Sequence, residues 1–79
     1  MQTYHNTSGH SGIAAYEYDD DSITVRFKRP GDSGATTYVY TSESAGAREV
    51  AQMKKMANAG VGLNTFINQH VRGQYASKY

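Results

Sequence analysis

The first half of the chain alternates apolar and polar residues with a period of two, the pattern of strands that bury one face. The clearest case is residues 23–28, where Ile23, Val25 and Phe27 are separated by polar side chains. Two further segments rich in tyrosine and apolar residues cover residues 13–18 and 36–41. Turn-forming residues separate the three segments, first DDDS and then PGDSG. We therefore predict three strands joined by tight turns, which is an antiparallel meander.

The lengths of the turns decide which sheet face the tyrosines occupy, because directly paired residues share a face. A two-residue first loop pairs Tyr18 with Ile23, Tyr16 with Val25 and Ala14 with Phe27. Tyr16 and Tyr18 then join the core, with Glu17 and Arg26 on the opposite face, whereas a three-residue loop would reverse this. A second loop centred on residues 32–33 pairs Tyr38 with Phe27 and Tyr40 with Val25. Both of these tyrosines would also face inward.

The second half of the chain changes to a helical period. Five residues at spacings of three and four fall on one face of a helix that runs to about residue 72: Leu63, Phe66, Ile67, His70 and Val71. A preceding helix is expected over residues 45–59, with Ser42 or Ser44 as its N-cap. Its buried side would hold Val50, Met53 and Ala57. Gly60 and Gly62 permit a sharp reversal between the two helices.

Together these elements predict an α+β fold, a three-stranded antiparallel β-meander followed by two α-helices packed on one sheet face (β-β-β-α-α). At 79 residues the chain is long enough for one domain only, which we place at residues 12–79. Residues 1–11 are rich in Gly, Ser, Thr and Asn and show no period. We therefore expect them to form a flexible N-terminal arm.

Charge and composition narrow the functional class only slightly. The net charge is +1, but residues 1–40 carry a net −2 and residues 41–79 a net +3, so the helical half is mildly basic. That is a weak signal for nucleic acid. No apolar run is long enough to span a membrane, and the first residues lack the apolar core of a secretory signal. With no cysteine in the chain, a reducing compartment fits, and we expect a cytoplasmic protein.

Catalytic and metal-binding candidates are few. His70 lies at the centre of the apolar helix face, and we interpret it as a hydrogen-bonded core residue rather than a catalyst. There is no cysteine nucleophile, no serine in a recognisable nucleophile context and no spaced carboxylate pair, so we predict that the chain is not an enzyme. His5 and His10 lack further ligands for a metal. Residues 19–21, three aspartates, indicate a turn rather than a calcium loop. We expect no cofactor, no metal and no small-molecule substrate.

Basic, amide and aromatic side chains remain as candidates for a binding function. The candidate contact residues are Arg26, Lys28, Lys54, Lys55, Asn68, Arg72 and Tyr75. Arg26 and Lys28 are expected on the sheet face that the helices leave open, where they could contact a phosphate backbone. Arg72 could also contact phosphate, and the amide of Asn68 could read base edges. The structural alternative is that Asn68 ties the loop between the helices and Arg72 is simply solvated.

Two function classes follow from these residues. The first is a small non-enzymatic binding module for RNA or single-stranded nucleic acid. The alternative is a protein–protein interaction module or accessory regulator, in which an exposed edge strand at residues 13–18 adds to the sheet of a protein partner. Near-neutral charge favours the second class, and the basic helical half favours the first.

Four short motifs within residues 12–76 resemble those of a known family. They are Ile13 with Tyr18-Asp19, Thr24-Val25-Arg26-Phe27, Tyr38-Val39-Tyr40, and an ending made by Asn68, Val71, Arg72 and Tyr75. In their order and spacing they resemble the KTSC domain, a module named for its occurrence at the C-terminus of some lysyl-tRNA synthetases. It also occurs as stand-alone small bacterial and phage proteins. Asn64 could equally match the family's asparagine, which would put Ile67 in place of Val71. The resemblance implies no established activity, and it implies RNA binding only through the association with a synthetase.

Overall fold

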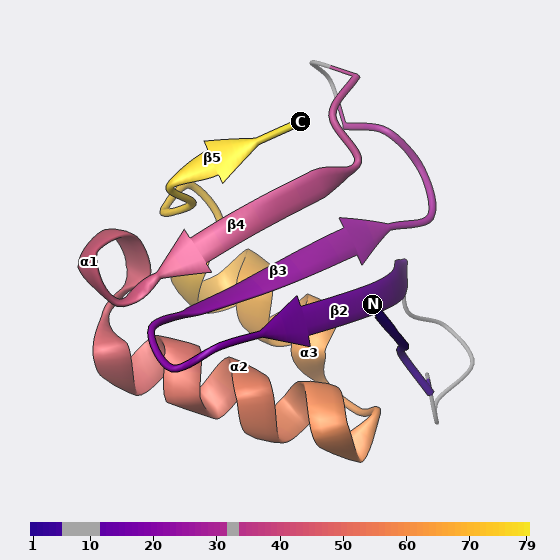
Figure 1. Cartoon of the computed structure of the whole chain (residues 1–79). Coiled ribbons are helices and arrows are strands. Elements are labelled where there is room, and N and C mark those ends of the chain that lie inside the picture. The colour runs from indigo at the N-terminus through magenta and orange to yellow at the C-terminus, as the bar shows by residue number, and fades with distance from the viewer. Residues whose placement is uncertain (6–11, 32–33) are drawn as a thin grey trace.

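A computed structural model describes residues 1–5, 12–31 and 34–79, and it confirms the α+β class and the antiparallel sheet. Within these residues the sheet has five strands in sequential order, two more than predicted: β1 (Gln2–Thr3), β2 (Ile13–Tyr18), β3 (Ser22–Phe27), β4 (Thr37–Thr41) and β5 (Ser77–Lys78). The helical segments are α1 (Ser42–Ala45), α2 (Ala47–Ala59), α3 (Leu63–Phe66) and a π-helical turn, η1 (Ile67–Val71). Figure 1 shows α2 and α3 together on one face of the sheet.

The first hairpin has the predicted register at its turn and departs from it at its open end. Tyr18 pairs with Ile23 and Tyr16 pairs with Val25, as a two-residue loop requires. Phe27 pairs with Ile13 rather than with Ala14, because the register shifts between residues 13 and 15. Such a bulge places an extra residue on one strand. The bulge puts Ile13 in the core, where it is fully buried.

The second hairpin is shifted by two residues from the prediction. Tyr38 pairs with Val25 and Tyr40 pairs with Ile23, which centres the connection from β3 to β4 one position earlier than predicted. A shift of two positions preserves the sheet face, since side chains alternate with a period of two. The predicted inward orientation of both tyrosines is therefore correct even though their partners are not.

Tyr18 does not join the core as predicted, since 43% of its surface is exposed. It shares the inner face with Tyr16, and their rings stack at a centroid distance of 6.2 Å. At this end of the sheet, however, the side chains that lie against the Tyr18 ring from α2 are polar. The amide of Asn58 donates to the Tyr18 hydroxyl at 3.0 Å, and the Lys54 ammonium lies 5.4 Å from its ring centroid.

The N-terminal residues are part of the sheet, so the flexible-arm prediction is wrong for residues 2–4. Gln2 pairs with Tyr16 and Thr3 pairs with Ala15. Tyr4 is 4% exposed, and its hydroxyl accepts a hydrogen bond from the backbone N–H of Leu63 at 3.4 Å. Residues 6–11 of the predicted arm lie outside the described residues. Because β1 covers β2, the prediction of an open edge along residues 13–18 is also wrong.

The helix expected over residues 45–59 is split at Gly46, whose φ of 103° is unfavourable for other residues. The preceding turn, α1, is capped by Thr41 rather than by Ser42 or Ser44. The Thr41 hydroxyl accepts from the Ser44 N–H, and the Ser44 hydroxyl accepts from the Thr41 N–H, each at 3.0 Å. In α2 the predicted buried side is confirmed, with Val50, Met53 and Ala57 all buried. The reversal that follows uses left-handed Gly60 and Gly62, as expected.

The last helix buries Leu63, Ile67 and Val71, while His70 is exposed and the core role predicted for it is wrong. The reason is the change from α3 to the π turn η1. The buried residues are spaced by four positions. This spacing is slightly more than one α-helical turn, which holds about 3.6 residues, and slightly less than one turn of the wider π-helix. The angular offset over the α-helical step and the offset over the π-helical step have opposite directions. Leu63, Ile67 and Val71 therefore stay on the same side of the helix. His70 is turned out to the surface, where its ring stacks on Phe66 at 4.6 Å.

Candidate functional site

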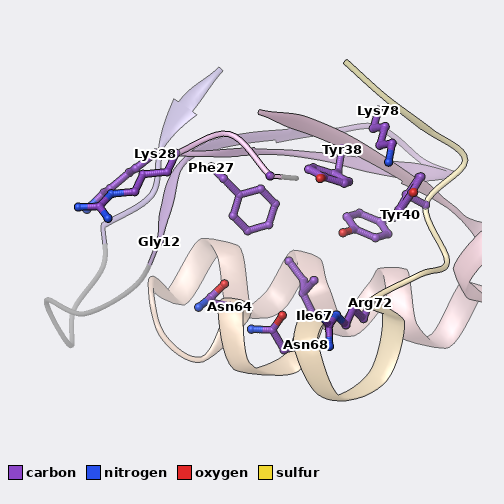
Figure 2. Close-up of a pocket in the computed structure, with 13 residues that line it drawn as sticks. Gly12, Phe27, Lys28, Tyr38, Tyr40, Asn64, Ile67, Asn68, Arg72 and Lys78 are labelled. Carbon is purple, nitrogen blue, oxygen red and sulfur yellow. The ribbon is translucent and has the colours of Figure 1, made fainter. Parts of the chain in front are cut away.

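A cavity of about 820 Å³ opens between the inner face of the sheet and the last helix. The sheet side and the adjoining loops contribute Gly12, Phe27, Lys28, Arg29, Gly31, Tyr38, Tyr40, Tyr75 and Lys78, and the helix side contributes Asn64, Ile67, Asn68 and Arg72. Figure 2 shows the two groups facing each other across the opening. The cavity has the size of a small-molecule or nucleotide site.

Three aromatic rings form one wall of this cavity. Phe27 at the end of β3 meets Tyr38 of β4 edge to face at a centroid distance of 5.5 Å. Tyr38 in turn meets Tyr75 edge to face at 5.2 Å. Tyr75 reaches this wall because the chain after η1 returns to the sheet, where the Ala76 N–H donates to the Val39 carbonyl at 2.7 Å. All three rings are half-buried, so they are ordered by the core and still reachable from the opening.

Tyr40 also contributes to the cavity from β4, although only 1% of its surface is exposed. Burial, followed by the proximity of Tyr38 and Tyr75, raises the pKa of Tyr40 to about 12. The phenol is therefore neutral at physiological pH, and it adds no negative charge to the cavity.

The helix contributes a polar stripe, in which Asn64, Asn68 and Arg72 follow one another at intervals of four. Figure 2 shows the two amides on the side of the helix that faces Phe27 and Tyr38. With the residues that the structure describes, these three side chains make no hydrogen bond or ion pair. They are therefore free to bind a ligand. The stripe runs through the π turn, and π turns inside helices are frequent at functional sites.

The charge of the cavity is one-sided. Four of the eight basic residues of the chain line it, namely Lys28, Arg29, Arg72 and Lys78, and none of the described lining residues is acidic. The aspartates of residues 19–21 precede β3, at the end of that strand away from the cavity. The Lys78 ammonium lies 5.2 Å from the centroid of the Tyr75 ring. The net charge of the whole chain is only +1, but the described lining of the cavity is locally basic.

The structure brings four of the seven predicted contact residues together in this cavity: Lys28, Asn68, Arg72 and Tyr75. The other three lie elsewhere. Arg26 is exposed on the opposite sheet face, and Lys55 is exposed on α2. Lys54 donates to the backbone carbonyl of Asp20 at 3.1 Å.

Lys28 itself was expected on the open sheet face with Arg26. It lines the cavity instead, because β3 ends at Phe27 and strict alternation ends with it. The sequence prediction missed Phe27 and Tyr38 of the aromatic wall, and it missed Arg29, Asn64 and Lys78 as site residues. Arg29 could have been found from its position beside the predicted residue Lys28. Asn64 could have been found because it is the first residue of the polar stripe.

Neither a metal site nor a membrane span is present among the described residues. No three His, Cys, Asp or Glu side chains among them lie close enough to hold a metal ion. The aspartates before β3 form a turn, in which the Ser22 hydroxyl donates to the Asp19 carboxylate at 2.9 Å. In the same part of the chain, no helix is both long enough and apolar enough to cross a membrane.

Comparison with protein-family models, curated proteins and solved structures finds no match to this chain. The fold and the cavity define a small α+β protein with a basic, aromatic-lined opening between sheet and helix. The resemblance to the KTSC domain stays a prediction.

Proposed function

We propose that this chain is a binding module for single-stranded nucleic acid, with RNA as the first candidate, and that the cavity is its binding site. The observation that carries the proposal is the composition of the cavity. It combines an aromatic wall, four cations and a pair of amides that make no hydrogen bond to a described residue, and none of the described lining residues is acidic.

Each of these groups matches one part of a nucleotide. Aromatic rings stack on bases, which is worth about 1–3 kcal/mol per base. Lysine and arginine bind phosphate, and asparagine amides hydrogen-bond to base edges. Single strands fit best because their bases are unpaired and can enter an opening between a sheet and a helix.

Binding without catalysis is the role that this lining favours. Among the described residues that line the cavity there is no histidine, cysteine, serine, threonine or carboxylate. This described lining offers lysine and tyrosine side chains but no histidine-based nucleophile–base pair and no carboxylate pair. The KTSC resemblance implies the same class of partner, through the association of that family with a synthetase.

The test is a titration of fluorescently labelled single-stranded RNA at low and at high salt. We expect binding at low salt that weakens as salt rises, because phosphate contacts release counterions. Absence of binding at low salt would contradict the proposal. Binding that survives high salt unchanged would also contradict it.

Lys28 and Arg26 provide a matched pair of variants for this titration, since they are two residues apart but on opposite sides of the sheet. Lys28→Met should weaken binding and reduce the salt slope by about 0.7 for one lost phosphate contact. Arg26→Met should change neither quantity. Equal losses of RNA affinity in both variants would show that the binding site is not the cavity.

A protein partner is the alternative class, and the structure offers it less support. The edges of the described sheet are β1 and β5, each of two residues, and short edge strands resist pairing with other chains. A pull-down with nuclease treatment separates the two classes, because contacts that depend on RNA are lost and direct protein contacts are not.

A further inference from the structure

We infer, on the basis of the proposed function, that the cavity takes a single nucleotide splayed out of the strand, with its two flanking phosphates bound by cations at opposite ends of the cavity. The base would lie against the aromatic wall and the amide stripe. The smallest ligand that satisfies the whole site would then be a nucleoside 3′,5′-bisphosphate.

The geometry of the aromatic wall limits the site to one base. The Phe27 and Tyr38 rings meet at 88°, and the Tyr38 and Tyr75 rings meet at 78°. A platform for successive bases needs ring faces that are presented side by side along the strand. Rings that are nearly perpendicular to their neighbours instead form the corner of a pocket, which surrounds one base.

The volume of the cavity agrees with this limit. About 820 Å³ lies in the range of sites for small molecules and cofactors, about 300–1,000 Å³. Asn64 and Asn68 on the facing helix bound the space opposite Phe27 and Tyr38, as Figure 2 shows. The strand on either side of the bound nucleotide would therefore run outside the cavity.

The cations lie in two groups with the aromatic wall between them. Lys28 and Arg29 follow directly after β3 and occupy one end of the opening. Arg72, the C-cap of η1, and Lys78 of β5 lie away from Lys28, one on the helix wall and one on the sheet wall of the cavity, as Figure 2 shows. A nucleotide within a strand has a phosphate on each side of its sugar. Cations at both ends of the cavity match that arrangement better than they match a single phosphate group.

The experiment is a calorimetric titration of the full chain with four adenosine probes. These are the 5′-monophosphate, the 3′-monophosphate, the 3′,5′-bisphosphate and an oligoadenylate longer than the cavity. Adenine is chosen because its donor–acceptor edge suits an amide. We expect the bisphosphate to bind about tenfold more tightly than either monophosphate, as one more charge-assisted contact would give. The oligoadenylate should add little to the affinity of the bisphosphate.

Two variants assign the phosphates to the two ends. Lys28→Met combined with Arg29→Met should remove the gain in affinity that one phosphate provides. Arg72→Met should reduce the gain in affinity that the other phosphate provides. All three side chains are exposed, so we expect these variants to fold as the parent does. A urea unfolding curve of each variant checks this.

The outcomes separate the inference from the proposed function. If affinity rises steadily with oligonucleotide length while the bisphosphate binds no better than the monophosphates, the single-nucleotide site is wrong but nucleic-acid binding stands. Equal effects of both variants on both monophosphates would also overturn the inference. If no probe binds, including the oligoadenylate, the proposed function itself fails.

Discussion

Tyr38 and Tyr75 are 37 positions apart in the sequence, and their rings meet edge to face with centroids 5.2 Å apart. The contact joins the beginning of β4 to the segment that follows the last helix. It completes the aromatic wall of the cavity, because Tyr38 also touches Phe27. One pair of side chains thus links the sheet, the C-terminal return of the chain and the candidate site.

Removal of the Tyr75 ring should weaken nucleic-acid binding more than it weakens the fold. For Tyr75→Ala we expect a loss of about 1–3 kcal/mol in binding, the usual value of one base–aromatic stack. Tyr75→Phe keeps the ring and should bind as the parent does. Anisotropy titrations with single-stranded RNA give the affinities, and urea unfolding gives the stability. Equal affinity of the alanine and phenylalanine variants would exclude a stacking role.

Gly31 should tolerate no side chain without a change in the cavity. A Cβ atom at this position would lie 2.7 Å from the Tyr38 hydroxyl, so the tyrosine ring would have to move. We expect Gly31→Ala to lower the affinity for RNA while the stability changes by less than about 1 kcal/mol, because the displaced atom is the end of a side chain.

Gly12 is the matched control, since it also lines the cavity but a Cβ atom there would meet nothing within 4 Å. Gly12→Ala should bind RNA as the parent does. Adding Tyr38→Phe to the Gly31 variant removes the clashing hydroxyl and should restore part of the affinity. The account of Gly31 fails if both glycine variants bind RNA equally well.

Tyr4 should contribute to stability as a core residue. It is buried, and its hydroxyl accepts the Leu63 N–H that begins the last helix. Tyr4→Ala should therefore lower the free energy of unfolding by about 3–5 kcal/mol, as large-to-small aromatic substitutions do. Tyr4→Phe should cost about 1 kcal/mol for the lost hydrogen bond. Urea unfolding measures both losses. An unchanged midpoint in Tyr4→Ala would show that the N-terminal residues do not pack in the core.

Alkaline pH should destabilise the fold through Tyr40. Its pKa is raised from the ordinary value of 10.0 to about 12, first by burial and then by Tyr38 and Tyr75. Below pH 10 the phenol is neutral in both folded and unfolded chains, so its contribution to stability is fully present. As pH rises from 10 towards 12, the unfolded chain loses this proton before the folded chain does, and stability falls.

Unfolding curves at a series of alkaline pH values test this directly. Tyr40→Phe should decline less steeply with pH than the parent. Some decline should remain, because burial and the neighbouring Tyr18 also raise the pKa of Tyr16. Identical slopes for the parent and the Tyr40→Phe variant would show that Tyr40 is not the titrating group.

The sequence was sufficient for elements whose pattern is repeated over several residues. Alternation over residues 23–28 gave the buried face of β3, and the spacing of Val50, Met53 and Ala57 gave the buried face of α2. Turn chemistry gave the register of the first hairpin near Tyr18. These features depend on local pattern, which one sequence contains.

What the sequence did not reveal depends on tertiary context. Two-residue strands such as β1 and β5 are too short to have a period, and only pairing with a neighbouring strand forms them. The exposure of His70 follows from a π turn that a regular helical period does not predict.

The candidate site was predicted in part for the same reason. Local spacing in the sequence singles out Asn68, Arg72 and Tyr75 as one group of candidate residues. Its partners Phe27 and Lys78 reach it only through the fold, from the end of β3 and from β5. A cavity assembled from distant segments has no signature in any one of them.

The most direct test of the proposed site is a chemical-shift map of the isotope-labelled chain titrated with a short single-stranded RNA. We predict that the shifts cluster on the cavity, on the side-chain amides of Asn64 and Asn68 and on the backbone of Gly31 and Tyr75. The outer sheet face around Thr24 and Arg26 should not respond. Shifts concentrated on that outer face, or no shifts at saturating RNA and low salt, would contradict the account.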